Sequence, residues 1–408
     1  MNKKKQKNFN NFRSVVSPEP QMQDQPAPLH GVTILQVLPA LGTGGVERGT
    51  LEITEAITRA GGRPLVASAG GALSAQIRRA GAKHITLPLG SKNPLTILAN
   101  AKALAGVILA ERVAIVHARS RAPAWAAWLA ASRTNAIFLT SYHGVYSENL
   151  PFKRAYNAVM TKGRLTIAIS RHVAEIIESR YQLPADKIRI IHRGADLALF
   201  DPGSVSGERI ANLAERWRLP PEPAPVILLP ARLTRWKGAE VLIRALAQLQ
   251  NQDAYAVLAG PEQGSGSFPH ALIALATRLG VADRLRLVGN CDDMQAAYRL
   301  ADVVVAPSLA PEPFGRTVVE AQAMGRVVIA TNHGGAAETI EHGVTGFLVP
   351  PGDATHLADA IDYVLKLSPP DRAAFGARAR ASVAAHFSKE TMQNATIAVY
   401  RELLEPNR

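Results

Sequence analysis

The stretch that says most about the fold is residues 303–320, which read VVVAPSLAPEPFGRTVVE. The apolar run 303–306 has the length and composition of a buried strand, and a Pro-rich loop follows it. Phe314-Gly315 then turns the chain into an expected helix that begins near Arg316. A short, continuously apolar strand followed by a loop and a helix is one repeat of a parallel α/β sheet.

The same unit recurs in two series along most of the chain. Strands are expected at 32–38, 64–67, 84–87, 114–117, 136–140, 165–168, 188–191, 226–229, 254–258, 285–288, 303–306, 327–330 and 346–349. Helices are expected at 47–59, 94–111, 123–132, 151–162, 171–180, 238–250, 270–279, 292–301, 316–324 and 354–366. The predicted fold class is therefore α/β, with two Rossmann-like doubly wound domains facing a cleft. Ligands are expected beyond the carboxyl ends of the strands.

Composition divides the chain into five segments. Residues 1–30 are rich in Lys, Pro and Gln and too polar to fold alone, so we expect a disordered basic arm. Residues 31–200 are expected to form the first domain, and the Pro/Gly-rich stretch 201–225 the linker, in which 208–217 could be a helix. Residues 226–385 are expected to form the second domain. A C-terminal helix over 386–408 follows, which could pack back on the first domain.

Charge is distributed unevenly between the two halves. The first 200 residues have a formal balance of +15 and the remainder −2, which together make the net charge of +13. A basic half can attract nucleic acid, an anionic membrane surface or an acidic substrate. It can also be a solvated basic surface without a partner.

Several classes of protein are excluded by composition. The chain has one cysteine, Cys291, so an intrachain disulfide and a Cys-rich zinc site are both impossible. The chain contains no run of 18 apolar residues, so no transmembrane helix is predicted. Residues 1–30 lack the apolar core of a secretory signal. We expect a cytoplasmic protein.

A glycine-rich loop, LGTGGVER over residues 41–48, follows the first expected strand. Gly44 and Gly45 would let the backbone approach a ligand closely, and the next helix would present free N–H groups. The dinucleotide fingerprint G-x-G-x-x-G fails because its third position is Glu47. A tight strand-to-helix turn without a ligand is the alternative.

A basic loop, PARLTRWKG over residues 230–238, follows the first strand of the second series. Arg232 offers a planar fork and Lys237 a point charge, a pair suited to a diphosphate. The alternative is a solvated basic loop.

The segment 312–320 offers three features at fixed spacing. Glu312 lies in a loop between two prolines, a helix N-terminus follows near Arg316-Thr317, and Glu320 lies about one turn inside that helix. A helix N-terminus binds anions, and carboxylates accept hydroxyl hydrogens. A sugar nucleotide needs a phosphate site and hydroxyl acceptors of this kind.

Together these motifs resemble the retaining family-4 glycosyltransferases of GT-B fold, and in their loops the bacterial lipopolysaccharide-core transferases. The resemblance spans about residues 31–405. It rests on Glu312-x7-Glu320, the loop 232–238, Gly44-Gly45, and the runs SYHG (141–144), IHRGAD (191–196), NHGGAAE (332–338) and GVTGFLV (343–349). It implies an enzyme that moves a hexosyl unit from a UDP- or GDP-sugar, with no cofactor.

The resemblance also implies residue roles. His143 and Glu312 would be the catalytic residues, with Glu312 holding hydroxyls of the donor sugar. The implied donor-binding residues are Gly44, Gly45, Arg232, Lys237, Asn290, Phe314, Gly315, Thr317 and Glu320. Of these, Arg232 and Lys237 would hold the diphosphate and Glu320 the ribose. Ala231 stands where many members have glycine, and we expect little effect.

The expected mechanism needs no metal. The chain contains no D-x-D motif, so a carboxylate-bound divalent cation on the diphosphate is not expected. Family members retain the anomeric configuration. Glu312 could be a nucleophile, as in retaining glycosidases, or a sugar-binding group while the acceptor attacks from the leaving-group face. The sequence leaves both schemes open.

The basic half is expected to receive an anionic glycan or lipid-linked acceptor, of lipopolysaccharide-core type, at an anionic membrane surface. The expected location is the cytoplasmic face of the inner membrane, held peripherally. Basic residues expected near strand ends are Arg119, Arg121, Lys153, Arg154, Lys162 and Arg164. A 2-epimerase of the same fold and a transferase with a soluble acceptor are alternatives. A nucleic-acid-binding protein would need aromatic platforms, and only 5% of the residues are aromatic.

Overall fold

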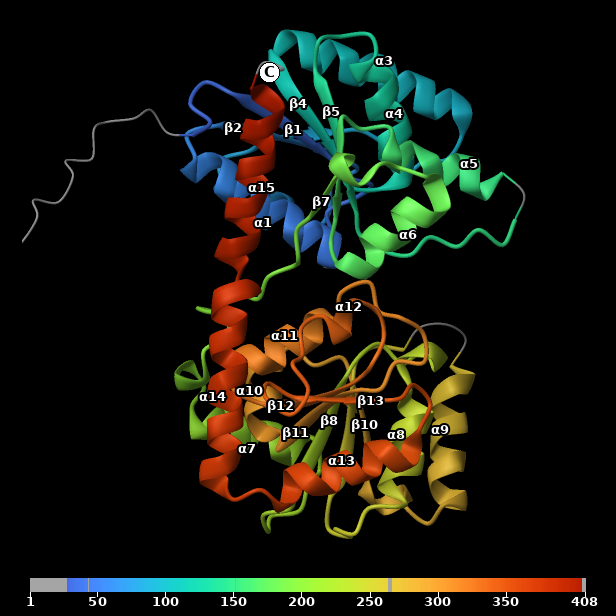
Figure 1. Ribbon diagram of the computed structural model, residues 1–408, viewed down its shortest axis with the longest axis vertical. Helices are drawn as coiled ribbons and strands as arrows, with labels where there is room; N and C mark the ends of the chain where they lie inside the picture. The colour runs from blue at the N-terminus through green and yellow to red at the C-terminus, as the bar shows by residue number, and fades with distance from the viewer. Residues whose placement is uncertain (1–27, 43, 151, 263–265, 406–408) are drawn as a thin grey trace, which may run out of the picture.

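The first domain is built on a parallel sheet (Figure 1). The computed structural model describes residues 28–42, 44–150, 152–262 and 266–405. Among them, seven strands form this sheet in the order β3-β2-β1-β4-β5-β6-β7. The strands are β1 (Thr33–Val37), β2 (Arg63–Ser68), β3 (Lys83–Thr86), β4 (Val113–Ala118), β5 (Ile137–Tyr142), β6 (Leu165–Ala168) and β7 (Ile188–Ile190). All neighbouring pairs are parallel.

Helices cover both faces of this sheet, which explains its continuously apolar strands. They are α1 (Gly45–Arg59), α2 (Ser74–Arg79), α3 (Pro94–Ala110), α4 (Arg121–Ala131), α5 (Lys153–Asn157) and α6 (Arg171–Tyr181). Adjacent strand residues point to opposite faces: Leu35 packs in the cluster with α3 and α4, and Ile34 in the cluster with α1. Both residues are fully buried.

The second domain repeats the arrangement with a smaller sheet. In the part of the chain that the structure describes, six parallel strands follow the order β10-β9-β8-β11-β12-β13. The strands are β8 (Val226–Pro230), β9 (Tyr255–Ala259), β10 (Leu285–Gly289), β11 (Val303–Ala306), β12 (Val327–Thr331) and β13 (Phe347–Val349). The helices are α8 (Ala239–Leu246), α9 (Ser267–Arg278), α10 (Met294–Leu300), α11 (Arg316–Ala323), α12 (Gly334–Ala337) and α13 (Ala354–Lys366). The predicted fold, α/β with two Rossmann-like doubly wound domains, is confirmed.

Each sheet has a switch point at which the strand order reverses. In the first sheet β1 lies between β2 and β4, and in the second β8 lies between β9 and β11. Loops that leave two such strands diverge and open a crevice at the carboxyl edge. The three sequence motifs, 41–48, 230–238 and 312–320, follow β1, β8 and β11 respectively.

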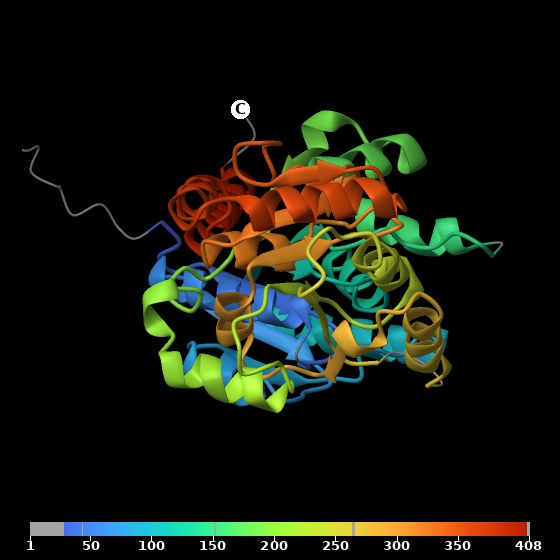
Figure 2. The ribbon, with the colours of Figure 1, turned by 90° about the horizontal axis from the view of Figure 1, so that it is seen from below.

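The last two helices run along one side of both domains (Figure 1). They are α14 (Pro369–His386), which packs on α11, and α15 (Lys389–Leu404), which packs on α1. Viewed from below, the red helices are seen almost end-on, so they lie close to one line (Figure 2). Tyr400 and Leu403 of α15 are buried in the first domain's core.

The two chain crossings between the domains are joined by backbone hydrogen bonds. The amide of Ala195 donates to the carbonyl of Phe387 at 2.8 Å, and the amide of Lys389 donates to the carbonyl of Ala195 at 2.8 Å. The side chain of Lys389 also pairs with Asp196 at 2.6 Å. The segment that leaves the first domain, at Ala195, and the segment that returns to it, at 387–389, are therefore hydrogen-bonded to each other.

Some local expectations need correction or lie outside the described residues. The expected helix 151–162 consists of the short helix α5 and a 3₁₀ turn, Ala158–Thr161. The helix that the sequence allows over 208–217 within the expected linker is present as α7 (Gly207–Arg216). Most of the predicted basic arm lies outside the described residues, and Leu29 within it is fully buried. No helix in the described ranges is long and apolar enough to cross a membrane.

Candidate functional site

A cavity of about 480 Å³ lies between the two domains. Its lining comes from α1, from the interdomain crossing, from the loop after β10, from the start of α10 and from α11. The residues that line it are Gly45, Arg48, Leu199, Phe200, Asn290, Cys291, Asp292, Met294, Gln295, Arg316 and Glu320. Three of the predicted donor-binding residues, Gly45, Asn290 and Glu320, therefore share one cavity. Its volume lies in the range of small-molecule sites.

Glu320 is a buried carboxylate on the inner face of α11. Its Oε2 accepts a hydrogen bond from the Tyr298 hydroxyl at 3.1 Å, and its Oε1 accepts one from Arg316 Nε at 3.0 Å. Burial raises the pKa of Glu320 above its ordinary value, although Arg316 and Tyr298 act in the opposite direction. The carboxylate is held in place, and a carboxylate has capacity for further hydroxyl donors.

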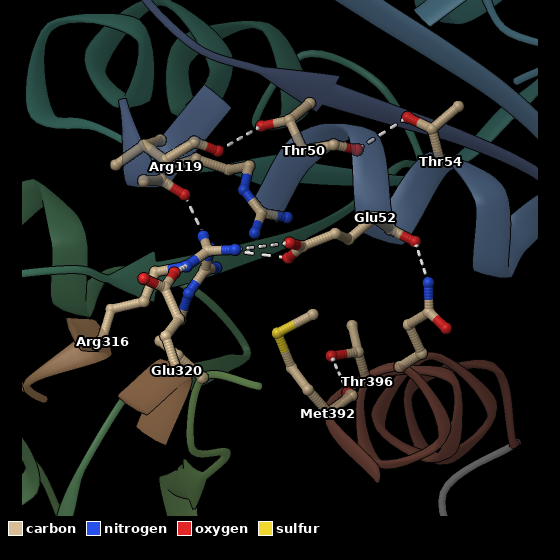
Figure 3. A network of polar contacts seen from close by, with 12 residues as sticks. Thr50, Glu52, Thr54, Arg119, Arg316, Glu320, Met392 and Thr396 are labelled. Atoms are coloured by element: carbon tan, nitrogen blue, oxygen red, sulfur yellow. Dashed lines mark hydrogen bonds and ion pairs between the residues drawn. The ribbon is translucent and has the colours of Figure 1, made fainter. Parts of the chain in front are cut away.

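Arg316 joins the two domains at this cavity, and the sequence interpretation gave it no role. Its Nη2 lies 3.0 Å from Oε1 of Glu52, which belongs to α1 of the first domain. Figure 3 shows Arg316 and Glu320 reaching from the second domain toward Glu52. The spacing of four residues between Arg316 and Glu320 could have indicated their pairing, but nothing local indicates Glu52.

Lys237 and Glu312 form an ion pair, so the structure brings the basic loop and the Pro-rich loop together. Oε1 of Glu312 also accepts a hydrogen bond from the Ser308 hydroxyl at 2.6 Å. The ammonium of Lys237 lies 4.3 Å from the centroid of the Trp236 ring. Gly238 has φ +76° and a Cβ there would collide with the carbonyl oxygen of Pro307, so only glycine allows this contact between loops.

Arg232 lies on the same loop as Lys237 but in a different state. Its side chain is exposed, and within the described residues it makes no hydrogen bond or ion pair. Among the described residues Arg232 is therefore an unpaired cation at the carboxyl edge of the second sheet, whereas Lys237 is already neutralised by Glu312.

The turn at Phe314-Gly315 positions the start of α11. Gly315 has φ +87°, and a Cβ there would lie 2.8 Å from the Cβ of Ala336. Thr317 lies in the first turn of α11, where backbone N–H groups have no helical acceptor. Phe314 is buried, with its ring centroid 6.0 Å from that of His192. The turn is thus fixed by packing from both domains.

Gly44 and Gly45 lie where α1 begins. Gly44 is the residue before the helix, and a Cβ at Gly45 would meet nothing within 4 Å, which agrees with its place on the cavity wall. The carbonyl of Gly45 accepts a hydrogen bond from Arg193 Nη2 at 2.6 Å. Burial lowers the pKa of the Arg193 guanidinium to about 9.

His143 lies just beyond β5 and lines a separate cavity of about 10 Å³ with Arg119 and Arg193. Its Nε2 is buried and has no hydrogen-bond partner in the described part of the chain. Burial, and then the charges of Arg119 and Arg193, hold the pKa of His143 well below its ordinary value, so the ring is neutral. A Cβ at the next residue, Gly144, would lie 3.9 Å from Pro313, so this turn faces the Glu312 loop.

Arg119, one of the basic residues expected near strand ends, directly follows β4 as expected, but its side chain is buried. Arg119 is only 3% exposed, and its Nη1 donates a hydrogen bond to Oε1 of Gln36 at 2.7 Å. Its side chain therefore lies inside the first domain rather than on an open surface. Arg121 is partly buried under Tyr146, 4.2 Å from the ring centroid.

Asn290 is exposed, and its side chain donates to Asp292 at 2.7 Å. It lines the 480 Å³ cavity and also a second cavity of about 350 Å³ next to α7. Among the described residues, no group of three or more His, Cys, Asp or Glu side chains is arranged to hold a metal ion.

Comparison with known proteins shows which protein family the chain resembles. Residues 43–199 match the family described as Glycosyltransferase Family 4, and residues 214–382 match Glycosyl transferases group 1. A glycosyltransferase from Rickettsia africae is 40% identical, with a TM-score of 0.85, over 92% of this chain and 99% of that chain. HepE from Anabaena, solved with UDP-glucose, is 25% identical, with a TM-score of 0.76, over 91% of this chain and 99% of that one.

Among curated proteins, D-inositol 3-phosphate glycosyltransferase from Mycobacterium tuberculosis is 33% identical over 244 residues. That match covers 59% of this chain and 49% of the relative, so the chain spans about half the length of the curated relatives it matches. The fold, both family matches and the 40% identical relative agree: the chain belongs to glycosyltransferase family 4 and has the GT-B fold.

Proposed function

We propose that the chain is a retaining glycosyltransferase that moves a hexosyl unit from a UDP- or GDP-sugar to an anionic, lipid-linked glycan of the cell envelope, of lipopolysaccharide-core type. The observation that carries the proposal is the grouping at the carboxyl edge of the second sheet. There the Lys237–Glu312 pair, the exposed cation Arg232 and the buried carboxylate Glu320 follow strands β8 and β11.

The nucleoside of the donor occupies the 480 Å³ cavity in this proposal. Glu320 accepts hydrogen bonds from the ribose hydroxyls, and Asn290 borders the base. The relative solved with UDP-glucose supports a nucleotide-sugar donor. Because Arg316 fixes one oxygen of Glu320, the ribose meets a carboxylate that needs little rearrangement.

The diphosphate is met by Arg232, Lys237 and the N-terminus of α11 at Thr317, with Gly44 and Gly45 allowing α1 to approach. Charge on the leaving diphosphate grows in the transition state, and fixed donors lower its energy. These cations and N–H groups are the reason that we propose turnover without a metal ion.

Glu312 acts as a sugar-binding group in this proposal, and the acceptor attacks from the leaving-group face. Oε1 of Glu312 already accepts hydrogen bonds from Lys237 and Ser308, which lowers the nucleophilicity of the carboxylate. His143, neutral and beside the Glu312 loop, hydrogen-bonds the transferred sugar. The departing diphosphate takes the acceptor proton.

A donor screen tests the proposal. The protein is incubated with UDP- and GDP-hexoses, with and without lipopolysaccharide core, in EDTA, and nucleoside diphosphate and products are measured. We expect acceptor-dependent release that persists in EDTA, and an anomeric proton signal that shows retention. Conversion of the donor to its 2-epimer without transfer would identify an epimerase instead. Turnover that EDTA abolishes and magnesium restores would disprove metal independence.

The acceptor side of the proposal rests on charge. The first 200 residues have a balance of +15, and a 33% identical relative is named for a phosphorylated acceptor, inositol 3-phosphate. A basic domain that binds a phosphorylated lipid would also approach the anionic membrane that holds it. We therefore include an anionic membrane surface among the partners.

We predict that the first domain binds anionic vesicles through apolar and basic residues near α3 and α5. Leu95 is 76% exposed and Phe152 is 87% exposed. Lys92 lies three residues before Leu95, and Lys153 directly follows Phe152. Each cation near an anionic surface contributes roughly 1 kcal/mol, and the effect ends within a Debye length, about 10 Å at 0.1 M salt. We expect co-sedimentation with anionic vesicles at 0.1 M salt but not at about 0.5 M, and none with neutral vesicles.

The matched variants are Phe152→Ser and Ile273→Ser. Ile273 is 49% exposed but lies on α9 of the second domain, so its replacement should leave vesicle binding unchanged. Phe152→Ser should weaken binding several-fold. If the intact protein stays in solution with anionic vesicles at 0.1 M salt, the membrane partner is wrong and the basic surface needs another explanation.

A further inference from the structure

Glu338 makes contacts across the domain boundary that no part of the proposed mechanism uses. It follows the short helix α12 of the second domain, and its carboxylate reaches the first domain. Oε2 accepts the backbone N–H of Arg171 at 2.8 Å, and Oε1 accepts that of His172 at 2.7 Å. The imidazole Nε2 of His192 lies 2.9 Å from Oε2.

These bonds complete the N-terminal cap of α6. The first N–H groups of a helix have no helical acceptor and need one from elsewhere. Ser170, the residue before α6, accepts the N–H of Val173 at 3.0 Å. The N–H groups of Arg171 and His172 are left, and their acceptor is Glu338. A helix of the first domain is thus capped by a carboxylate of the second, at the end where the helix dipole favours negative charge.

Glu338 is charged at neutral pH. Burial on its own would raise the pKa of this carboxyl, but hydrogen bonds from His192, His172 and Arg171 outweigh that effect and hold the pKa below its ordinary value. The contact is therefore a charge-assisted one, which is stronger than a neutral hydrogen bond.

The segment that carries Glu338 also holds the Glu312 loop. The amide of Gly335 donates to the carbonyl of Glu312 at 2.7 Å, and Gly334 pairs with Glu312 as a β-bridge. A Cβ at Gly335 would collide with the carbonyl of Pro313, so α12 lies directly against this loop. A shift of Glu338 relative to α6 would therefore shift the loop that carries Glu312.

His192 connects the same contact to the interdomain crossing. Its ring centroid lies 6.0 Å from that of Phe314 and 5.3 Å from that of Phe387. Phe314 belongs to the Glu312–Gly315 loop, and Phe387 joins α14 to α15. His192, Glu338 and Phe314 thus form one packed unit where the chain passes between domains.

We propose that Glu338 is a positioning residue, which caps α6 across the domain boundary and thereby holds the Glu312–Gly315 loop in place against the first domain. It does not touch the donor. The inference rests on the proposed glycosyl transfer for its catalytic consequence, whereas the capping contact itself is independent of any substrate. Losing the contact should lower turnover without lowering affinity for the nucleotide.

The test compares Glu338→Gln with Glu341→Gln, a control whose side chain is exposed three residues further on. Without any ligand, amide hydrogen exchange at Arg171 and His172 should become at least about fivefold faster in Glu338→Gln, because one acceptor and the charge are lost. The control should exchange like the unchanged protein. Unchanged exchange in Glu338→Gln would overturn the proposed cap.

The second readout is the division between kcat and nucleotide affinity. We expect kcat to fall at least about tenfold in Glu338→Gln, while Kd for the free nucleoside diphosphate, measured by calorimetry, stays within about twofold. His192→Gln, which spares the α6 cap, should lower kcat less. Equal losses in kcat and affinity, or an unchanged kcat, would overturn the positioning role. If the unchanged protein shows no transfer at all, the proposed function fails, while the exchange result still decides the cap.

Discussion

Replacing Glu312 by glutamine is expected to lower kcat about 10²- to 10³-fold, the range measured when one fixed group that stabilises a transition state is removed. Glu312 is buried, and its Oε1 is held by Lys237 and Ser308, so the carboxylate is aligned before substrate arrives. Glutamine keeps the shape but removes the charge. The sugar becomes positively charged in the transition state, so the loss falls on turnover rather than on ground-state binding.

Steady-state kinetics and calorimetry check this result together. Affinity for the free nucleoside diphosphate should not fall in Glu312→Gln, because that ligand lacks the transferred hexose that Glu312 is proposed to contact. Glu341→Gln, exposed in the same domain, is the control for a general effect of replacing glutamate. A normal kcat in Glu312→Gln would show that Glu312 has no role in turnover.

The same position also distinguishes the two retaining schemes. If Glu312 were a nucleophile, a small anion such as azide could replace the missing carboxylate in Glu312→Ala. Azide would then attack the donor sugar, release the nucleoside diphosphate and give a glycosyl azide as product. We expect no rescue by azide, because two donors already occupy Oε1. Rescue would mean that a glycosyl–Glu312 intermediate forms in the unchanged enzyme.

Most of the fold could be predicted from the sequence because both sheets are buried on both faces. Strands such as Val303–Ala306 are then short, unbroken apolar runs, which stand out from the polar loops around them. The short helices α2 and α12 were not predicted, since six and four residues are too few to show a helical period. One of them, α12, packs against the Glu312 loop.

The site could be predicted only where its signal is local. Glu312, Gly315 and Glu320 lie within nine positions and follow one strand, so their spacing alone indicates a constellation. The contacts between domains have no local signal. Arg316 and Glu52 are 264 positions apart, and Glu338 and His172 are 166 apart. The burial of Arg119 could not be predicted either, because a basic residue after a strand reads as exposed.

Lys237→Ala is expected to weaken nucleoside diphosphate binding more than Arg232→Ala does, although both residues are proposed to hold the diphosphate. Arg232 is exposed and unpaired among the described residues, so its loss removes only its own phosphate contacts, worth roughly 2 kcal/mol or about 30-fold in Kd. Lys237 has the additional task of neutralising Glu312. Its loss leaves a buried carboxylate beside the diphosphate, and we expect roughly 3–4 kcal/mol in total.

Calorimetry with UDP and GDP measures these losses, and Arg235→Ala is the control. Arg235 lies on the same loop, is exposed and pairs with Glu240 at 3.2 Å, so its removal tests the effect of loop charge alone. Its Kd should change less than about threefold. Affinity like that of the unchanged protein in both Arg232→Ala and Lys237→Ala would exclude this loop as the phosphate site.

A double mutant separates the two causes of the Lys237 effect. If repulsion from the unpaired Glu312 carboxylate contributes, Lys237→Ala with Glu312→Gln should bind the nucleoside diphosphate more tightly than Lys237→Ala alone, by roughly 1–2 kcal/mol. Strictly additive changes in the binding free energy would mean that Lys237 acts on the phosphates independently of Glu312. Since Glu312→Gln alone leaves Lys237 free of its carboxylate, that single variant should bind the diphosphate at least as tightly as the unchanged enzyme. The combination of tighter ground-state binding and slower turnover in one variant is the pattern expected of a carboxylate that acts on the sugar while restraining the lysine beside it.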